Sequence, residues 1–238
     1  MITYRRLIAV EAPRVAKLFG DAFPLDGPHS WARAVGFTNS LEGYMKTYVP
    51  TPINSDLGSF GAWFKERGGE GETLVGSVLI EPFDHVDEKD GSEGEDYLTP
   101  RIYKEPYDAI EGLLEACTTV FFRELLQRNP EDYSKLQTKE RKSGYISWIA
   151  TDEAHRRKYI ANSLIQHACE RMKEEPFNYD YAIAYCVGPA ATKTFIREGF
   201  ELWRRIEYKS FAMKGEDGLD IHPYSTLPDE VSVVVKKL

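Results

Sequence analysis

Hydrophobic positions along the first half of the chain recur with helical or strand-like periods, and polar breaks separate them. Val15, Leu18 and Phe19 lie on one helical face, and proline pairs interrupt the chain near 24–28 and 50–52. A glycine-rich turn at 68–71 joins two apolar runs, the pattern of a β-hairpin. The elements predicted here are a strand at 2–8, helices at 11–23 and about 30–48, and hairpin strands at 60–64 and 73–80.

The second half alternates helical and strand patterns and contains no repeat or linker. A strong apolar face begins after Pro106 and stops at Asn129-Pro130, and Gly199 follows another amphipathic segment as a helix-ending residue does. The predicted elements are helices at 106–129, around 164–172 and at 189–198, strands at 145–150, 179–187, 201–213 and 231–235, and a polar connection at 131–142. We expect one α/β domain over 1–238, with a mixed central sheet flanked by helices.

Composition agrees with a globular chain that closes one hydrophobic core. The 238 residues are 42% apolar and 29% charged. No apolar window approaches the ~20 residues that span a bilayer, and the N-terminus lacks a signal-peptide pattern. Three scattered cysteines favour buried free thiols over disulfides or a metal site. We therefore expect a cytoplasmic protein with no metal and no membrane partner.

Acidic residues are concentrated in one stretch. The net charge is −8, and residues 84–96 contain seven acids and one lysine. The rest of the chain is nearly neutral, which argues against nucleic acid as a partner. We interpret 84–96 as a solvated loop insertion, although such a loop could also attract a cationic substrate.

A basic turn lies where the strand at 145–150 ends and the next helix begins. Helix N-termini present unpaired N–H groups and a positive dipole end, which together bind phosphate, and the turn adds three cations. The candidate anion-binding residues are Ile149, Ala150, Thr151, Arg156, Arg157, Lys158, Tyr159, Ile160, Ala161 and Asn162.

This turn resembles the signature segment of the GNAT superfamily of N-acetyltransferases. Arg156, Tyr159 and Ala161 occupy the three signature places, with Tyr159 replacing a customary glycine. The resemblance implies that the loop amides hold the acetyl-CoA pyrophosphate and that the strand before it presents backbone groups to the pantetheine arm. It also implies that the N–H near Ile149 contacts the thioester carbonyl. Tyr159 adds a Cβ and a ring, so we expect the loop to tilt or the ring to turn outward.

A second segment, 188–200, is similar to the family's Asn-Pro-Ala-Ala, Tyr, Gly-Phe motif. Gly188 stands in the Asn place, Ala191 at the second alanine and Phe195 in the place of a Tyr that commonly protonates the leaving thiolate. Ala191 and Phe195 are therefore further cofactor-contact candidates. The overall layout, including an extra helix inserted before the cofactor-binding strand, is similar to the arylalkylamine N-acetyltransferase branch of insects and other invertebrates.

The base that deprotonates the amine is less well marked. Related amine acetyltransferases carry a carboxylate beside a Pro-Leu pair at the end of the first helix, and here Phe23 precedes Pro24-Leu25. Asp26 and Asp21 are the nearest carboxylates, and either is the candidate base. Cys186 could be a nucleophile, but its apolar strand without an adjacent His favours an inert buried thiol.

The resemblance implies an acetyl-CoA-dependent N-acetyltransferase that acts on a small primary amine of the arylalkylamine or polyamine type, by direct transfer in a ternary complex. The expected partner is a small-molecule amine, and the expected state is a monomer or weak dimer. The alternative is a non-catalytic acyl-CoA-binding or regulatory domain on the same fold, since the Tyr, the Asn and the usual hydroxyl residues are missing.

Overall fold

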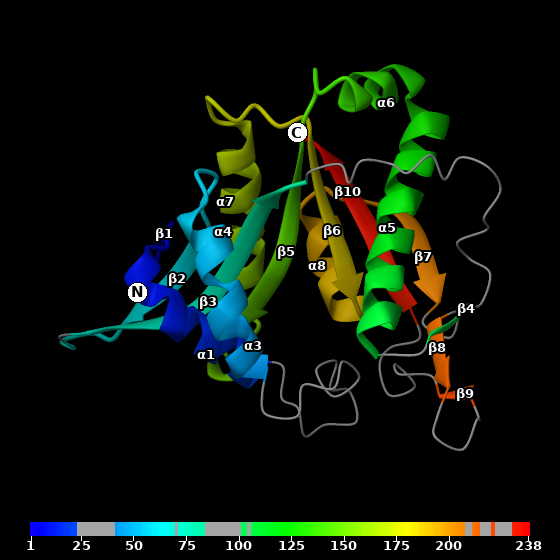
Figure 1. Cartoon of the computed structure of the whole chain (residues 1–238). Coiled ribbons are helices and arrows are strands. Elements are labelled where there is room, and N and C mark those ends of the chain that lie inside the picture. Colours follow the sequence, from blue (N-terminus) through cyan, green and yellow to red (C-terminus); the bar gives the residue numbers. More distant parts are fainter. Residues whose placement is uncertain are drawn as a thin grey trace.

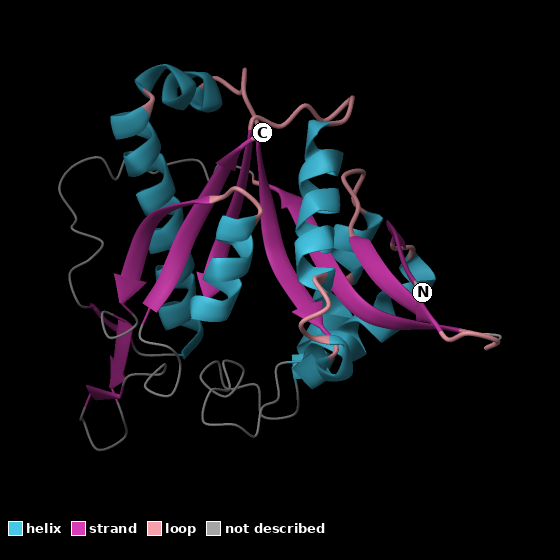
Figure 2. Cartoon of the chain, turned by 180° about the vertical axis from the view of Figure 1, so that it is seen from behind, coloured by secondary structure: helices cyan, strands magenta, loops and turns pink. Residues whose placement is uncertain are grey.

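The computed structural model describes residues 1–22, 41–69, 71–83, 101–103, 106–207, 211–214, 220–221 and 230–238. Its centre is a seven-stranded sheet in the order β1-β2-β3-β5-β6-β10-β7, with helices on both faces (Figures 1 and 2). The strands are β1 (Ile2–Arg6), β2 (Phe60–Lys65), β3 (Glu72–Pro82), β5 (Ser143–Thr151), β6 (Tyr181–Val187), β7 (Glu201–Glu207) and β10 (Glu230–Lys237). The predicted α/β class is confirmed.

Helices α7 (Ile160–Lys173) and α8 (Pro189–Arg197) cover one face of this sheet, seen from behind in Figure 2. On the other face, α1 (Ala12–Ala22), α3 (Leu41–Tyr48) and α4 (Pro50–Asn54) cover the half around β3, while α5 (Pro106–Arg128) covers β6, β10 and β7. The 3-10 turns η1 (Ala9–Glu11) and η2 (Glu153–His155) precede α1 and α7. The inserted helix before the cofactor strand is α5, as predicted.

The sheet divides in its middle. Every neighbouring pair is antiparallel except β5 and β6, which are parallel and pair only through residues 143–146 and 181–184. Beyond Ile146 and Ala184 the two strands separate, so residues 148–151 of β5 pair with β3 alone. Backbone groups on that edge of β5 are therefore available to a ligand.

Most of the element order predicted from periodicity is confirmed, including the β2/β3 hairpin. The expected helix over 30–48 is described only from Leu41, as α3, and its earlier part lies outside the described residues. The acidic stretch 84–96 also lies outside them.

Two predictions were wrong. The polar connection at 131–142 is largely a helix, α6 (Pro130–Gln137), because the Asn129 side chain accepts a hydrogen bond from the Asp132 N–H and so caps its first turn. The single strand expected at 201–213 is two strands, β7 and β8 (Phe211–Lys214). β8 joins β4 (Arg101–Tyr103) and β9 (Asp220–Ile221) in a separate three-stranded sheet, so its partners differ from those of β7.

Candidate functional site

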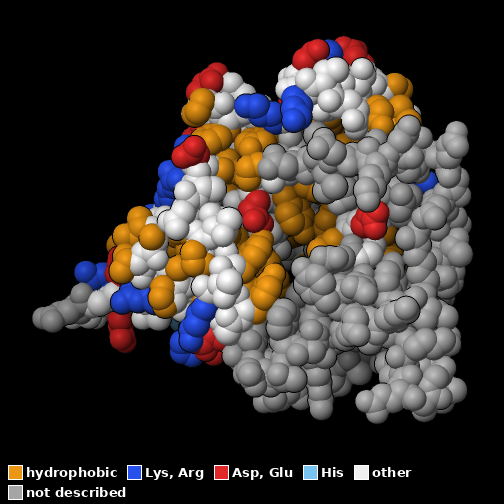
Figure 3. Space-filling model, viewed as in Figure 1, with side chains coloured by type: hydrophobic (Ala, Val, Ile, Leu, Met, Phe, Trp, Pro, Cys, Tyr) orange, Lys and Arg blue, Asp and Glu red, His pale blue; other side chains and the backbone are white. Residues whose placement is uncertain are grey.

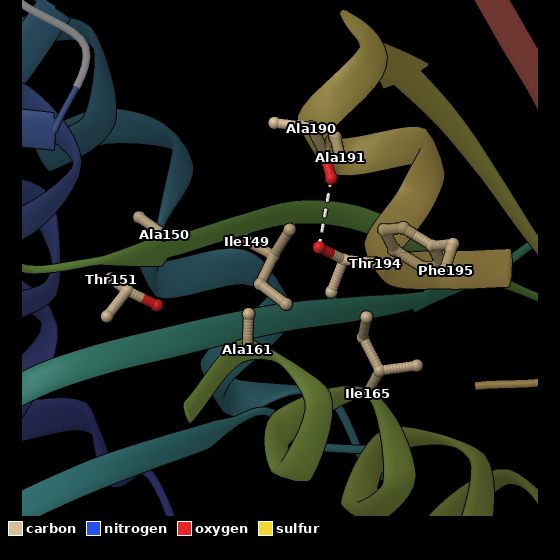
Figure 4. A pocket seen from close by; sticks show the side chains of 9 residues that line it. All are labelled: Ile149, Ala150, Thr151, Ala161, Ile165, Ala190, Ala191, Thr194 and Phe195. Carbon is tan, nitrogen blue, oxygen red and sulfur yellow. Dashed lines mark hydrogen bonds between the residues drawn. The ribbon is translucent and has the colours of Figure 1, made fainter. Parts of the chain in front are cut away.

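A cavity of about 190 Å³ lies where β5 separates from β6, on the face covered by α7 and α8. Its wall is mainly apolar (Figure 4). The lining residues are Ile149, Ala150 and Thr151 of β5, Ala161 and Ile165 of α7, and Ala190, Ala191, Thr194 and Phe195 of α8. Six residues named from the sequence meet here, because the end of β5 and the starts of both helices converge on the gap.

The register of β5 against β3 sets the direction of its backbone groups. The Asp152 N–H donates to the Val75 carbonyl at 2.9 Å, and the pairing stays in register through Gly76/Thr151 and Val78/Ile149. In an antiparallel pair, hydrogen-bonded residues alternate with residues whose N–H and C=O point away from the partner. Ile149 and Thr151 are of the second kind, so their backbone groups face the gap toward β6.

Thr151 also brings a polar side chain into the cavity wall. Its Oγ1 is buried and has no hydrogen-bond partner among the described residues. By contrast, the Thr194 hydroxyl across the cavity donates to the Ala190 carbonyl at 2.9 Å, the dashed line in Figure 4. A buried hydroxyl without a partner is costly, and a ligand amide or hydroxyl in the cavity would satisfy it.

The turn from β5 to α7 is built around Asp152. Its side chain caps η2 by accepting from the Ala154 N–H at 3.1 Å and contacts His155 Nδ1 at 2.8 Å. The His155 ring packs on Phe64 of β2, with 5.1 Å between ring centroids. His155 therefore supports the turn.

Tyr159 takes the conformation that the customary glycine would adopt. It is the N-cap of α7 with φ 58°, in the left-handed region, and 68% of the residue is exposed. The ring thus turns outward, one of the two expected outcomes. The first hydrogen bond of the helix runs from the Ser163 N–H to the Tyr159 carbonyl, at 3.1 Å. The N–H groups of 160–162 therefore have no acceptor within the helix.

Three cations surround that helix start. Arg156, Arg157 and Lys158 are exposed, and Arg156 approaches Glu153 only at 4.0 Å. Arg157 and Lys158 form no ion pair with any described residue. Together with the free N–H groups, they make the mouth of the cavity suited to an anion such as a phosphate.

Helices α7 and α8 are fixed to each other beside the cavity. The side chains of Asn162 and Gln166 each donate to the Glu198 carboxylate at 2.7 Å. The amide side chain of Asn162 is therefore engaged with α8, and what it offers at the cavity is its backbone N–H. Phe195 is buried and meets Phe200 edge to face at 4.9 Å, which makes it a rigid apolar wall.

Of the two candidate bases, the structure describes only Asp21, which does not line the cavity. Asp21 lies on the exposed face of α1, where Lys17 Nζ contacts its carboxylate at 2.8 Å. Asp26 falls outside the described residues. Sequence reasoning missed Ile165, Ala190 and Thr194 as lining residues, and only their spacing on the two helices could have indicated them.

The described residues support neither a cysteine nucleophile nor a metal site. All three cysteines are buried, and burial raises the pKa of Cys186 to about 12, so its thiol stays protonated at neutral pH. No group of three or more potential ligands is assembled as a metal site in the described part of the chain. None of its helices combines the length and hydrophobicity needed to cross a bilayer.

Residues 123–200 match the Acetyltransferase (GNAT) family, a range that contains β5, the basic turn, α7, β6 and α8. This segment forms the two strands that separate, β5 and β6, and the cavity beside them. The GNAT resemblance predicted from the two motifs is thus confirmed over this segment, which is about a third of the chain.

Solved structures with this fold extend the likeness over the whole chain. Polyamine N-acetyltransferase of Drosophila melanogaster superposes with a TM-score of 0.65 at 15% identity, covering 100% of both chains. Mosquito arylalkylamine N-acetyltransferase-like 5b gives a TM-score of 0.62 at 15% identity, again over 100% of each. Arylalkylamine N-acetyltransferase 2 of Aedes aegypti gives 0.60 at 15% identity, covering 99% of this chain and 98% of that one. No curated protein matches this chain in sequence.

Proposed function

We propose that this protein belongs to the GNAT superfamily and is an acetyl-CoA-dependent N-acetyltransferase that acts on a small primary amine, of the arylalkylamine or polyamine type, in a ternary complex. One observation carries the proposal. The cavity at the β5/β6 gap combines outward-facing strand amides, a buried unpaired hydroxyl and a cationic helix start. The proposal takes 1–238 as one domain with 84–96 as an insertion.

The chemistry of the cavity wall suits acetyl-CoA. The N–H groups of 160–162 with Arg156, Arg157 and Lys158 would hold the pyrophosphate. The backbone of Ile149 and Thr151, and the Thr151 hydroxyl, would bond the amide groups of the pantetheine arm. Ala161, Ala191 and the Phe195 ring offer the apolar contacts that its methylene groups need.

The reaction requires no enzyme nucleophile. The acceptor ammonium loses one proton to a base, its nitrogen attacks the thioester carbonyl carbon, and a C–N bond forms. The C–S bond then breaks, the thiolate leaves with the electron pair, and it takes the second proton of the amine. A preorganised N–H such as that of Ile149 would stabilise the oxyanion that develops on the carbonyl. Asp26 or Asp21 stays our prediction for the base, acting directly or through water.

The geometry of Phe195 favours a second candidate, a non-catalytic acyl-CoA-binding domain. No phenol stands at this wall to protonate the thiolate, and Phe195 is buried with its edge against Phe200. Both candidates require acetyl-CoA binding, so turnover separates them.

The deciding experiment measures thiol release from acetyl-CoA in the presence of aromatic, aliphatic and polyamine acceptors. Release above the hydrolysis blank, with an equal yield of acetylated amine, supports the enzyme. Tight CoA binding with no release for any amine would establish the non-catalytic domain instead.

Calorimetry tests the cofactor site independently. Arg156→Glu with Arg157→Glu should weaken CoA binding at least about tenfold, because two charge-assisted contacts are lost, and should make the remaining affinity less dependent on salt. The control with the same change in net charge is Arg67→Glu with Lys139→Glu, two exposed cations away from the cavity. Equal affinities in the two double variants would remove the turn from the cofactor site.

A further inference from the structure

A carboxylate stands beside the gap on the face of the sheet opposite the cavity. Glu81, near the end of β3, pairs with Tyr145 of β5, one residue before the β5/β6 pairing ends at Ile146. Its side chain meets Tyr48 of α3, and Tyr145 packs with the cluster under α5. Glu81 therefore lies on the face of the sheet that α3 and α5 cover, next to the point where the sheet divides. Figure 1 shows these two helices on that face.

Only one oxygen of this carboxylate is occupied. The Tyr48 hydroxyl donates to Glu81 Oε2, and Ser147 is within hydrogen-bond reach of the same hydroxyl. Oε1 has no hydrogen bond to any described residue, and Glu81 is partly exposed. Burial, together with the charge of Glu81, raises the pKa of Tyr48, so the phenol remains a donor and holds the carboxylate in place.

Aromatic rings surround the pair. Tyr44 stacks on Tyr48 with 5.8 Å between centroids, and Trp148 meets Tyr48 edge to face at 6.3 Å. On the β5/β6 side, the Tyr145 and Tyr185 rings lie 5.0 Å apart. Figure 3 shows a hollow between the two halves of this face, with hydrophobic side chains on its floor and acidic groups beside them. A carboxylate among ring faces is the arrangement that binds organic cations.

Beyond Ile146, the side chains of β5 lie on both faces of the sheet. Trp148 and Ala150 pack toward α1 and α3, while Ile149 lies in the α7 and α8 cluster and Thr151 lines the cavity there. Successive β5 residues thus point to opposite faces, at a place where no strand pairing with β6 closes the sheet. An amine in the hollow would meet a thioester threaded along β5 at this opening.

We propose that Glu81 binds the ammonium group of the acceptor, with Tyr48 positioning the carboxylate and the neighbouring rings receiving the apolar body of the amine. The inference rests on the proposed function and narrows it to a primary monoamine with an aromatic body. Glu81 acts here in recognition and specificity, a role separate from the base predicted at Asp26 or Asp21.

Direct titration tests this without requiring turnover. 2-Phenylethylammonium is titrated calorimetrically into the CoA-saturated protein and into its Glu81→Gln variant. Removing one charge-assisted contact should weaken binding at least about tenfold. Glu72→Gln, an exposed carboxylate on the same strand, is the matched control and should bind as the wild type does. No binding by the wild type, or equal binding by the two Glu variants, would overturn the proposal.

A neutral probe excludes a merely structural role. 2-Phenylethanol has the same ring and chain without the charge, so Glu81→Gln should change its affinity less than about threefold, because only the ammonium contact is removed. An equal loss for both probes would mean that the hollow has collapsed, and the proposal would be rejected. Tyr48→Phe should weaken ammonium binding by a smaller factor, about threefold to fivefold, because the carboxylate stays and only its positioning bond is lost.

The same variants separate this inference from the proposed function. Glu81→Gln should retain wild-type CoA affinity, since the cofactor cavity lies on the other face. If the wild type binds the amine but releases no thiol, the enzyme proposal fails while the ammonium site stands. If it acetylates amines and Glu81→Gln keeps both amine affinity and turnover, the enzyme stands and the ammonium site fails.

Discussion

Thr151 gives the cavity wall its one described side-chain hydroxyl that lacks a partner within the protein. An unpaired buried hydroxyl lowers stability, and a ligand that pairs with it regains that free energy on binding. Such a hydroxyl should therefore lower the free energy of unfolding and raise the affinity for the ligand. A residue that only packs does not have these two opposite effects.

Thr151→Val should lower CoA affinity about fivefold to tenfold, while the free energy of unfolding stays equal or rises by about 1 kcal/mol, because the shape is kept and the unpaired group is removed. Calorimetry and urea denaturation measure the two effects. Ser77→Ala, which removes another buried hydroxyl without a described partner but outside the cavity lining, should affect stability alone. A Thr151→Val variant with unchanged affinity would show that the hydroxyl does not contact the cofactor.

Phe195 raises the question of whether a leaving thiolate needs an acid. A simple thiol has a pKa of about 8.5, so the departing sulfur is tolerable as a thiolate near neutral pH. Phe195→Tyr should therefore change amine-dependent thiol release little, or raise it by at most about 10- to 100-fold, with the wild type already active. A silent wild type that gains activity from the added hydroxyl would identify the native protein as a disabled binder.

At the scale of elements, the sequence was most informative where apolar periodicity and a motif coincide, as in β5, α7 and α8. It was least informative where partners are distant: the β8 pattern continues from β7, and only pairing with β4, over 100 residues away, separates them. The cavity residues Ile165, Ala190 and Thr194 carry no distinctive chemistry, so packing alone reveals them. Glu81 was overlooked because it ends an otherwise apolar strand.

The sequence contains a signal for helix α6 that the prediction of a polar connection did not use. Asn129 caps it, Pro130 stands in its first turn, and its buried residues are Asp132 and Leu136. Helix α6 is attached to the sheet mainly through Asp132 and not through an apolar face. Arg141 Nη2 lies 3.0 Å from its carboxylate, Lys237 Nζ lies 2.8 Å away, and the Tyr181 hydroxyl donates to it. A polar helix is thus held against the sheet by a buried carboxylate and its partly exposed cationic partners.

Asp132→Asn should destabilise the protein by on the order of 2 kcal/mol at pH 7, because a buried carboxylate loses its charge-assisted contacts with Arg141 and Lys237, whose side chains are partly exposed. Burial opposes ionisation of Asp132, but the bonds from Lys237 and Tyr181 and the charge of Arg141 outweigh it and lower its pKa. The stabilisation is therefore present above the unfolded-state pKa of about 3.9 and is lost as pH falls through the lower folded-state value.

Urea denaturation from pH 7 down to pH 3 should accordingly show the difference between wild type and Asp132→Asn shrinking below about pH 4. Glu131→Gln is the neighbouring control, because that exposed carboxylate pairs with Lys135 alone among the described residues and should contribute little to stability. A difference that persists at pH 3 would mean that the variant acts through packing and not through charge.

At the scale of the whole molecule, two halves of one sheet meet through a short seam. β1, β2, β3 and β5 form one half, and β6, β10 and β7 the other, joined by four residue pairs between 143–146 and 181–184. The helices divide in the same way on the α1 and α5 face, while α7 and α8 are clamped together by Glu198. A ligand lying in the gap supplies contacts that the missing strand pairs do not.

Native-state hydrogen exchange should make this division visible. The amides of Ile149 and Thr151, which face the gap, should exchange faster than those of the seam at 143–146, and saturating CoA should slow them at least about tenfold by blocking local opening. Amides of β10, paired on both sides with β6 and β7, serve as the internal reference and should change little. Protection that appears along α5 instead, with Ile149 and Thr151 unchanged, would place the cofactor on the wrong face of the sheet and refute the site argued from β5.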